Sequence, residues 1–246
     1  MSKAISMKKI FNTKVITLFP ENFPGILGIG VIGKALKNKL WKLEVIDIRK
    51  FGKGNHKKVD DTTAGGGPGM ILKADVLGLA IDKSLKGVKD LDKTPIVYLS
   101  PRGKSLTQNK VKKISKGDGI ILLCGRYEGV DQRVLDKYKI EEISLGDFIL
   151  AGGEIAAQAV LEATIRLIPG VLGDSDSLDN ESFKSDLLEF PQYTRPRSWK
   201  NIEIPDVLNS GNHKNIDIWR KDMSKKLTKK IRPDLWEKYK KKQDIK

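Results

Sequence analysis

The sequence is short of several features that would assign it to a class of protein. Its 246 residues contain one cysteine, Cys124, which excludes an internal disulfide and a cysteine-based metal cluster. No apolar run approaches the roughly 20 residues that a membrane-spanning helix needs. Residues 1–14 contain scattered lysines but lack the apolar core of a signal peptide. We therefore expect a cytoplasmic protein that contacts no membrane.

Basic residues are present in large excess. The 46 lysines and arginines against 31 aspartates and glutamates give a net charge of +15. Such a surface attracts polyanions, with nucleic acid as the first candidate and an anionic membrane as the second. An AT-rich genome, which inflates lysine usage, is the alternative explanation. The excess is uneven, however, because residues 220–246 hold twelve basic and four acidic side chains. This tail is suited to a phosphate backbone, although a solvated helix face would have a similar composition.

Short β-type and helical stretches alternate along the first two thirds of the chain. β-type runs lie at residues 15–19 and 43–48, and the clearest buried strands are 96–99 and 120–123. Helical patterns lie at residues 33–40, 71–85 and 154–168. This alternation predicts an α/β domain with a mainly parallel sheet.

The pattern changes near residue 170. Residues 170–188 are rich in aspartate and serine and poor in apolar side chains, which predicts a flexible linker. Beyond it, residues 215–220 and 221–239 have helical patterns, with a break at Pro233. We therefore predict a catalytic domain over residues 1–169, a linker over 170–188 and a small C-terminal helical domain over 189–246.

Glycine-containing loops follow three of the predicted strands. They are YLSPRG at residues 98–103, CGRYEG at 124–129 and LGDFILAGGE at 145–154. Neither a G-x-G-x-x-G turn nor a Walker motif is present, so an ordinary dinucleotide or P-loop site is not supported. Loops after neighbouring parallel strands lie along one edge of a sheet, and we expect these three to form a single pocket. Cys124, at the end of a strand, is interpreted as a small buried residue and not as a catalytic thiol.

Several motifs together resemble one known family. GGGPGM at 65–70, YLSP at 98–101, CGRYEG at 124–129, GGE at 152–154, IPGVLG at 168–173, YTRP at 193–196 and SGNH at 210–213 stand in the order found in bacterial tRNA (guanine-N1)-methyltransferases (TrmD) of the SPOUT superfamily. The match runs over residues 15–219. The resemblance implies a SPOUT-type parallel sheet with a C-terminal trefoil knot, bound S-adenosylmethionine and a homodimer with composite active sites. It also implies methylation of guanosine 37 in tRNA, beside the anticodon.

On this resemblance, twelve residues match the positions at which the family contacts its cofactor. Backbone groups would read the adenine edge, and apolar side chains would cover its faces. The twelve are Tyr98, Leu99, Ser100, Pro101, Gly125, Tyr127, Leu145, Gly146, Phe148, Leu150, Gly152 and Gly153.

Methylation of N1 of guanine requires a base and a cation. N1 carries a proton in the neutral base, so a general base must remove it, and a cation near O6 would stabilise the negative charge that develops. Arg166 matches the family's proposed cation. The family usually has aspartate before a Ser-Phe pair in the linker, whereas Glu181 precedes that pair here. We expect Glu181 to be the base, with Asp179 or Asp176 as alternatives.

Glu128 stands beside the cofactor loop. It is a candidate to orient the guanine or to help hold Mg²⁺, which the family is reported to need; a salt bridge with Arg126 or Arg133 that only shapes the turn is the alternative. We expect no dedicated metal site. The family commonly has Arg-Pro-Tyr before the glycines of residues 65–70, and this chain has Thr62, Thr63 and Ala64 instead.

The expected partner is tRNA, with no role for DNA. Candidates for phosphate or base contacts are His56, His213, Arg195, Arg197 and Arg220. Two other functions stay open. A SPOUT enzyme acting on a different RNA nucleotide would explain the loops but not the family-specific linker and SGNH motif. A non-catalytic RNA-binding protein would explain the charge but not the three loops.

Overall fold

The computed structural model describes residues 9–173 and 181–244. The chain divides into two compact units, Met1–Gly173 and Asp174–Lys246. No helix within the described residues is long and apolar enough to cross a membrane.

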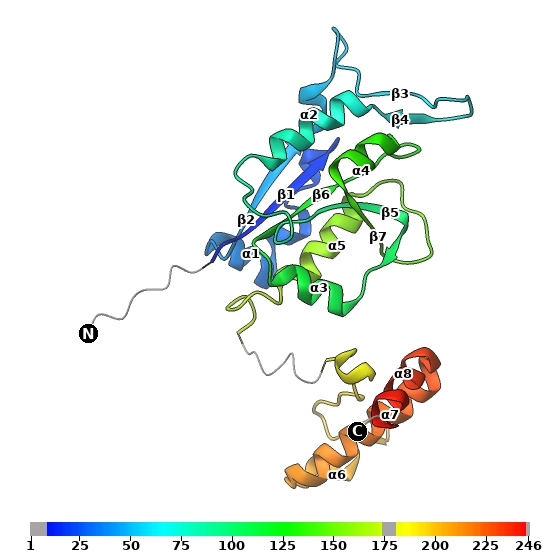
Figure 1. Ribbon diagram of the computed structural model, residues 1–246. Coiled ribbons are helices and arrows are strands. Elements are labelled where there is room, and N and C mark those ends of the chain that lie inside the picture. Colours follow the sequence, from blue (N-terminus) through cyan, green and yellow to red (C-terminus); the bar gives the residue numbers. More distant parts are fainter. Residues whose placement is uncertain (1–8, 174–180, 245–246) are drawn as a thin grey trace. The chain divides into compact units, whose positions relative to one another are not determined.

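The first unit is built on a five-stranded parallel sheet (Figure 1). Its strand order is β2 (Trp41–Asp47), β1 (Phe11–Thr17), β6 (Gly119–Leu123), β5 (Ile96–Ser105) and β7 (Glu141–Ser144). The helices are α1 (Gly30–Lys37), α2 (Ala74–Leu85), α3 (Gln108–Ser115), α4 (Gln132–Tyr138) and α5 (Glu154–Ile165). Short 3-10 helices are η1 (Pro20–Asn22), η2 (Gly25–Gly28) and η3 (Ile48–Phe51). The predicted α/β class with a parallel sheet is confirmed.

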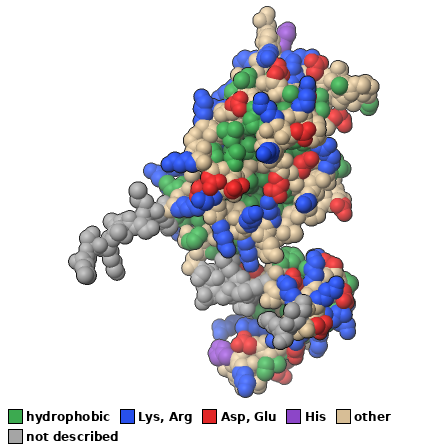
Figure 2. Space-filling view, in the orientation of Figure 1, with side chains coloured by type: hydrophobic (Ala, Val, Ile, Leu, Met, Phe, Trp, Pro, Cys, Tyr) green, Lys and Arg blue, Asp and Glu red, His purple; other side chains and the backbone are tan. Residues whose placement is uncertain are grey.

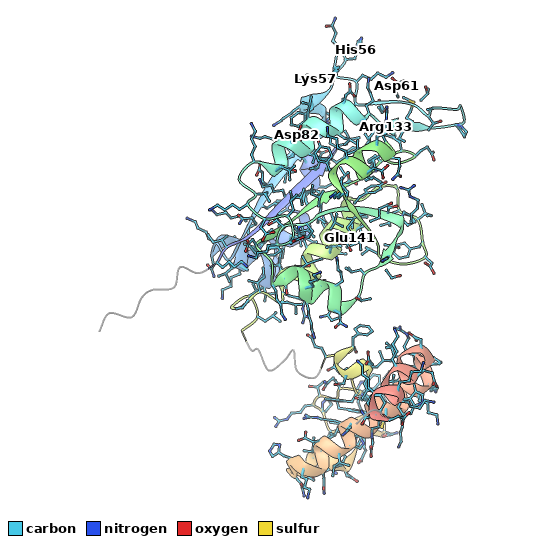
Figure 3. The ribbon with its side chains drawn as sticks, in the orientation of Figure 1. His56, Lys57, Asp61, Asp82, Arg133 and Glu141 are labelled. Atoms are coloured by element: carbon cyan, nitrogen blue, oxygen red, sulfur yellow. The ribbon has the colours of Figure 1, made fainter. Side chains whose placement is uncertain are left out.

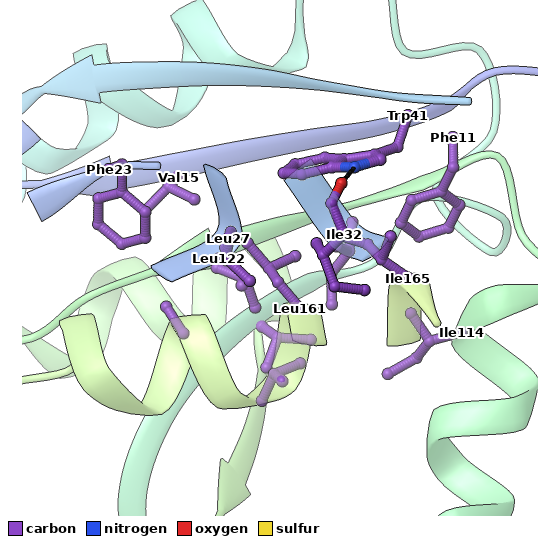
Figure 4. Close-up of a cluster of buried hydrophobic side chains, with 14 of the residues drawn as sticks. Phe11, Val15, Phe23, Leu27, Ile32, Trp41, Ile114, Leu122, Leu161 and Ile165 are labelled. Atoms are coloured by element: carbon purple, nitrogen blue, oxygen red, sulfur yellow. Dashed lines mark hydrogen bonds between the residues drawn. The ribbon is translucent and has the colours of Figure 1, made fainter. Parts of the chain in front are cut away.

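Two hydrophobic clusters cover the two faces of this sheet. Successive side chains of a strand point to opposite faces, so Leu122 of β6 packs in one cluster with α5, and Ile121 packs in the other with α2. Both are fully buried, which explains the uninterrupted apolar run of β6. Figure 4 shows the first cluster, in which the indole of Trp41 donates a hydrogen bond to the Ile32 carbonyl at 3.0 Å.

Residues 71–85 were predicted to be helical throughout, and the start of that range is wrong. Met70–Leu72 is strand β4, paired antiparallel with β3 (Asp60–Thr62), and α2 begins only at Ala74. The Leu72 amide also donates to the Gly129 carbonyl at 3.1 Å. Backbone partners distant in the sequence therefore overrode the helical spacing of the apolar residues.

Two other predicted segments also have different bounds in the structure. The predicted loop 98–103 lies inside β5, whose pairing with β7 slips between Leu99 and Lys104, so that this segment bulges from the ladder. The helix predicted over 154–168 ends at Ile165.

The second unit is mainly helical. It contains η5 (Lys184–Asp186), β8 (Ser198–Trp199), β9 (Ile202–Glu203), α6 (Asp206–Asn209), α7 (His213–Ile231) and α8 (Pro233–Asp244). The helical segments predicted on either side of residue 220 form one continuous helix, α7, and the predicted break at Pro233 is confirmed. Residues 174–180, within the predicted linker, lie outside the described residues.

Candidate functional site

The three glycine-containing segments meet at one end of the sheet, where β5, β6 and β7 end. They enclose a cavity of about 520 Å³. All twelve residues that the sequence predicts to contact a cofactor line it. The parallel order β6-β5-β7 explains this convergence, because the carboxyl ends of parallel strands share one edge. Their role in binding stays a prediction.

Glycines allow the backbones of these segments to approach one another closely. A Cβ atom on Gly125 would lie 2.7 Å from the hydroxyl oxygen of Tyr98, and one on Gly153 would lie 2.8 Å from the Cα atom of Cys124. The Gly153 amide donates a hydrogen bond to the Gly125 carbonyl at 3.0 Å. The loop after β7 therefore rests directly on the end of β6, and a side chain at position 153 would separate the two.

Large apolar side chains at the cavity are unusually exposed. Tyr127 is 56% exposed, Phe148 54% and Ile149 79%, in a unit whose other aromatic side chains are mostly buried. Tyr127 also has a φ of 58°, a left-handed conformation that side chains rarely adopt. Such walls fit a flat, partly apolar ligand, because binding would remove their surface from water.

Glu128 lies against the glycine-rich loop of residues 65–70. Its amide donates to the Met70 carbonyl at 2.9 Å, and a Cβ on Gly69 would lie 2.5 Å from the Glu128 side chain. The two arginines considered as its partners have other carboxylates: Arg126 pairs with Glu154 at 2.8 Å and Arg133 with Asp131 at 2.7 Å. Glu128 also lines the cavity.

Cys124 is buried, as expected for a structural residue. Burial raises the pKa of its thiol well above the ordinary value, and the nearby Glu154 carboxylate raises it further. Thiolate is the nucleophilic form of cysteine, so this environment suppresses its reactivity.

The predicted cation, Arg166, does not line this cavity. Arg166 caps the C-terminus of α5, whereas the cavity lies at the N-terminus of that helix. The twelve residues of α5 separate these two ends by about 18 Å at 1.5 Å per residue. Glu181 belongs to the second unit and is half-buried. The alternatives Asp176 and Asp179 lie outside the described residues.

A second cavity, of about 480 Å³, shares Tyr127 with the first. It is lined by a basic segment that contains Lys53, His56 and Lys57; Figure 3 labels the last two on the loop that leads into β3. Asp60 forms a hydrogen bond with Tyr127. The pKa of Tyr127 is raised, mainly by burial of its hydroxyl and secondly by the negative charge of Asp60. Sequence reasoning identified His56 but not this cavity, although the basic run of residues 53–58 was a visible signal.

Basic side chains are spread widely over the surface. Figure 2 shows lysines and arginines on both units. In the second unit, Arg197 pairs with Asp206 at 3.0 Å, and Arg220 stacks on Phe190 with its guanidinium carbon 5.1 Å from the ring centre. The described residues contain no group of three or more His, Cys, Asp or Glu placed to hold a metal ion.

Comparison with known sequences identifies relatives over almost the whole length. The family model described as tRNA (Guanine-1)-methyltransferase TrmD matches residues 11–238. The chain is 55% identical over 239 residues to the tRNA (guanine-N(1)-)-methyltransferase of Ruegeria sp. (strain TM1040), covering 97% of each. It is 50% identical over 233 residues to the protein of that name from Zymomonas mobilis, covering 95% of this chain and 92% of the relative. The chain is 50% identical over 229 residues to the protein of that name from Brucella ovis, covering 93% of this chain and 92% of the relative.

Proposed function

The chain belongs to the tRNA (guanine-N1)-methyltransferase family, and on that basis we propose that it methylates N1 of guanosine 37 in tRNA, with S-adenosylmethionine as the methyl donor. The observation that carries this proposal is the convergence of all twelve predicted donor-contacting residues on one cavity. The reaction is placed in the cytoplasm, where tRNA is available.

The cavity fits the proposed donor in size and chemistry. Its volume of about 520 Å³ lies within the range of small-molecule sites. The glycines expose backbone donors and acceptors that suit the edge of an adenine ring, and Tyr127, Phe148 and Leu150 offer apolar surface for its faces. The bound donor supplies an electrophilic methyl group, and the protein's task is to align it with N1.

Residues of the chain then handle the proton and the charge. Glu181 removes the N1 proton, which frees the lone pair that accepts the methyl group. Arg166 stabilises the negative charge that develops on O6. Glu128, at the rim of the cavity beside the glycine-rich loop, orients the guanine. A guanosine within an anticodon loop must leave its stack before these groups reach its Watson–Crick edge.

The distance along α5 supports a homodimer with composite active sites. Arg166 is about 18 Å from the cavity end of its own helix, which is farther than an arginine side chain extends. Two copies with antiparallel α5 helices would bring Arg166 of each copy toward the cavity of the other. Exposed apolar side chains are available for this contact. Ile26 of η2 is 61% exposed, Ile29, the residue after η2, is 71% exposed, and Ile155 of α5 is 66% exposed.

Membership of the family is also our basis for proposing a knot and a division into two domains. We assign a trefoil knot to the C-terminal part of the sheet, supported by the return of the loop after β7 onto the end of β6. Residues 170–188 are assigned as the interdomain linker between a catalytic domain over 1–169 and a tRNA-binding domain over 189–246. The helices α7 and α8 and their many lysines support that last role.

The decisive experiment compares two tRNA transcripts that differ only in having guanosine or adenosine at position 37. Incorporation of labelled methyl groups should occur only with guanosine 37, and reverse transcription should stop at that nucleotide, because N1 methylation blocks Watson–Crick pairing. Equal methylation of the adenosine transcript would instead indicate another SPOUT activity. A protein that binds tRNA but not S-adenosylmethionine in calorimetry would be a non-catalytic RNA binder.

A further inference from the structure

Arg126 joins three separate segments of the first unit. One terminal nitrogen of its guanidinium lies 2.8 Å from the Glu154 carboxylate, and the other donates to the Ala151 carbonyl at 3.2 Å. The guanidinium also covers the ring of Phe19, 4.3 Å from its centre. The segments joined are the end of β1, the turn after β6 and the loop that leads into α5.

Glu154 anchors the other end of this cluster. Its side chain is 3% exposed, and its second carboxylate oxygen accepts a hydrogen bond from the Thr17 hydroxyl at 2.7 Å. It occupies the first position of α5, where the helix dipole favours a negative charge. Arg126, which is 23% exposed, thus forms a network with the buried side chains of Glu154 and Thr17, hereafter the Arg126 network.

Gly152 has a specific role in this network. A Cβ on Gly152 would lie 2.3 Å from the Nε atom of Arg126, so a side chain at position 152 would push the arginine off its path to Glu154. The Gly-Gly pair before α5 is therefore more than a tight turn. Gly152 makes room for Arg126, and Gly153 makes room for the end of β6.

The loop held by Arg126 has space into which it can move. Arg126 lines the 520 Å³ cavity on one side and a smaller cavity of about 290 Å³ on the other. Leu150, Ala151 and Gly152 line both cavities as well. Without the arginine, this wall of the larger cavity has neither its hydrogen bond nor its steric support.

Stability alone explains the Arg126 network poorly. The Nε–H of Arg126 is buried without an acceptor among the described residues, and ion pairs that carry such a cost are often no more stabilising than apolar side chains of similar volume. The contacts of Arg126 with Glu154 and Ala151 do, however, set the separation between the turn after β6 and the loop after β7.

We infer that Arg126 is a positioning residue, which sets the shape of the methyl-donor cavity by holding residues 150–154 against the turn after β6. This inference rests on the proposed function, because it assigns the donor to that cavity. It predicts that donor affinity depends on the Arg126–Ala151 and Arg126–Glu154 contacts separately from their effect on folding.

The test uses Arg126→Met, Glu154→Gln and the double variant, in the full-length protein. The dissociation constant for S-adenosylmethionine is measured by calorimetry and the unfolding temperature by circular dichroism. Arg126→Met should unfold at a lower temperature, because it leaves a buried carboxylate unpaired. The double variant has no unpaired charge and should regain most of that loss. Both variants that lack the arginine should bind the donor at least tenfold more weakly than wild type.

Arg133→Met is the matched control, since Arg133 also pairs with a nearby aspartate but is 82% exposed and lies outside the cavity lining. It should bind the donor as wild type does. Recovery of donor affinity together with stability in the double variant would show that Arg126 is merely structural and would overturn the inference. So would donor affinity in Arg126→Met within twofold of wild type. Failure of the wild type itself to bind S-adenosylmethionine would overturn the proposed function and the inference with it.

Discussion

Replacing Gly153 with alanine adds one methyl group where α5 begins, at a close backbone contact beside the cavity. Gly153 has φ −81° and ψ −6°, which alanine adopts without strain. The effect of the substitution is therefore purely steric. The new Cβ would lie 2.8 Å from the Cα of Cys124, 3.1 Å from the amide nitrogen of Gly125 and 3.2 Å from the Cβ of Cys124. Two of these atoms are backbone, in a strand end that is fully packed, so the start of α5 has to move instead.

The cost has two parts. Inserting a methyl group into a well-packed site costs about 1–3 kcal/mol. Weakening the hydrogen bond from the Gly153 amide to the Gly125 carbonyl costs about 0.5–1.5 kcal/mol more. We expect a loss of about 2–4 kcal/mol in the free energy of unfolding, which lowers the unfolding temperature by roughly 4–16 °C in a unit of this size. Because the displaced segment lines the cavity, donor affinity should also fall, by tenfold or more.

Thermal unfolding and calorimetric titration with S-adenosylmethionine measure the two effects. Gly173→Ala is the matched control, because nothing lies within 4 Å of a Cβ at that position and its φ is not in the left-handed region. It should change neither quantity appreciably. If Gly153→Ala unfolds at the same temperature as Gly173→Ala and binds the donor equally well, the close approach of α5 to β6 does not exist as described.

Three further predictions concern the base, a helix and a tyrosine. Glu181→Gln should lower the single-turnover rate by at least about a hundredfold while donor affinity stays within twofold; an unchanged rate would place the base elsewhere in the linker. Gly78→Ala should raise the unfolding temperature by roughly 1–4 °C, because alanine favours the interior of α2 by about 0.5–1 kcal/mol and its Cβ meets only an ordinary contact at 3.5 Å. Burial and a hydrogen bond to Asp82 raise the pKa of Tyr138 to about 12, so this contact stabilises the fold below pH 10 and is lost as the pH rises through 12. Tyr138→Phe should therefore lose less stability than wild type between pH 10 and 12, and equal losses would contradict that pKa.

Much of the fold could be predicted because local patterns agree with the final structure. Strand β6 is apolar without interruption and is buried on both faces, so its pattern and its environment match. The start of α2 was wrong because Met70–Leu72 finds a strand partner in β3, which no periodicity in this segment indicates. Likewise, the bulge in β5 depends on how β7 pairs with it.

The cavity was predictable in membership but not in its electrostatics. Three glycine-containing loops after three strands predicted one shared pocket, and the twelve residues do line one cavity. From the sequence, a salt bridge between Glu128 and either Arg126 or Arg133 was an alternative to a binding role for Glu128. Arg126 instead crosses to Glu154, because Gly152 leaves a passage and α5 begins beside the end of β6.

The class of the domain, the convergence of three loops on one cavity and the family can be inferred from the sequence, since strand periodicity and short glycine motifs are local properties. Which charged groups meet depends on the tertiary fold. It paired Arg126 with Glu154 and placed Arg166 at the far end of α5 from the cavity. The physical reason is that an ion pair depends on separation in space, and the separation of distant residues is set by strand order and helix length.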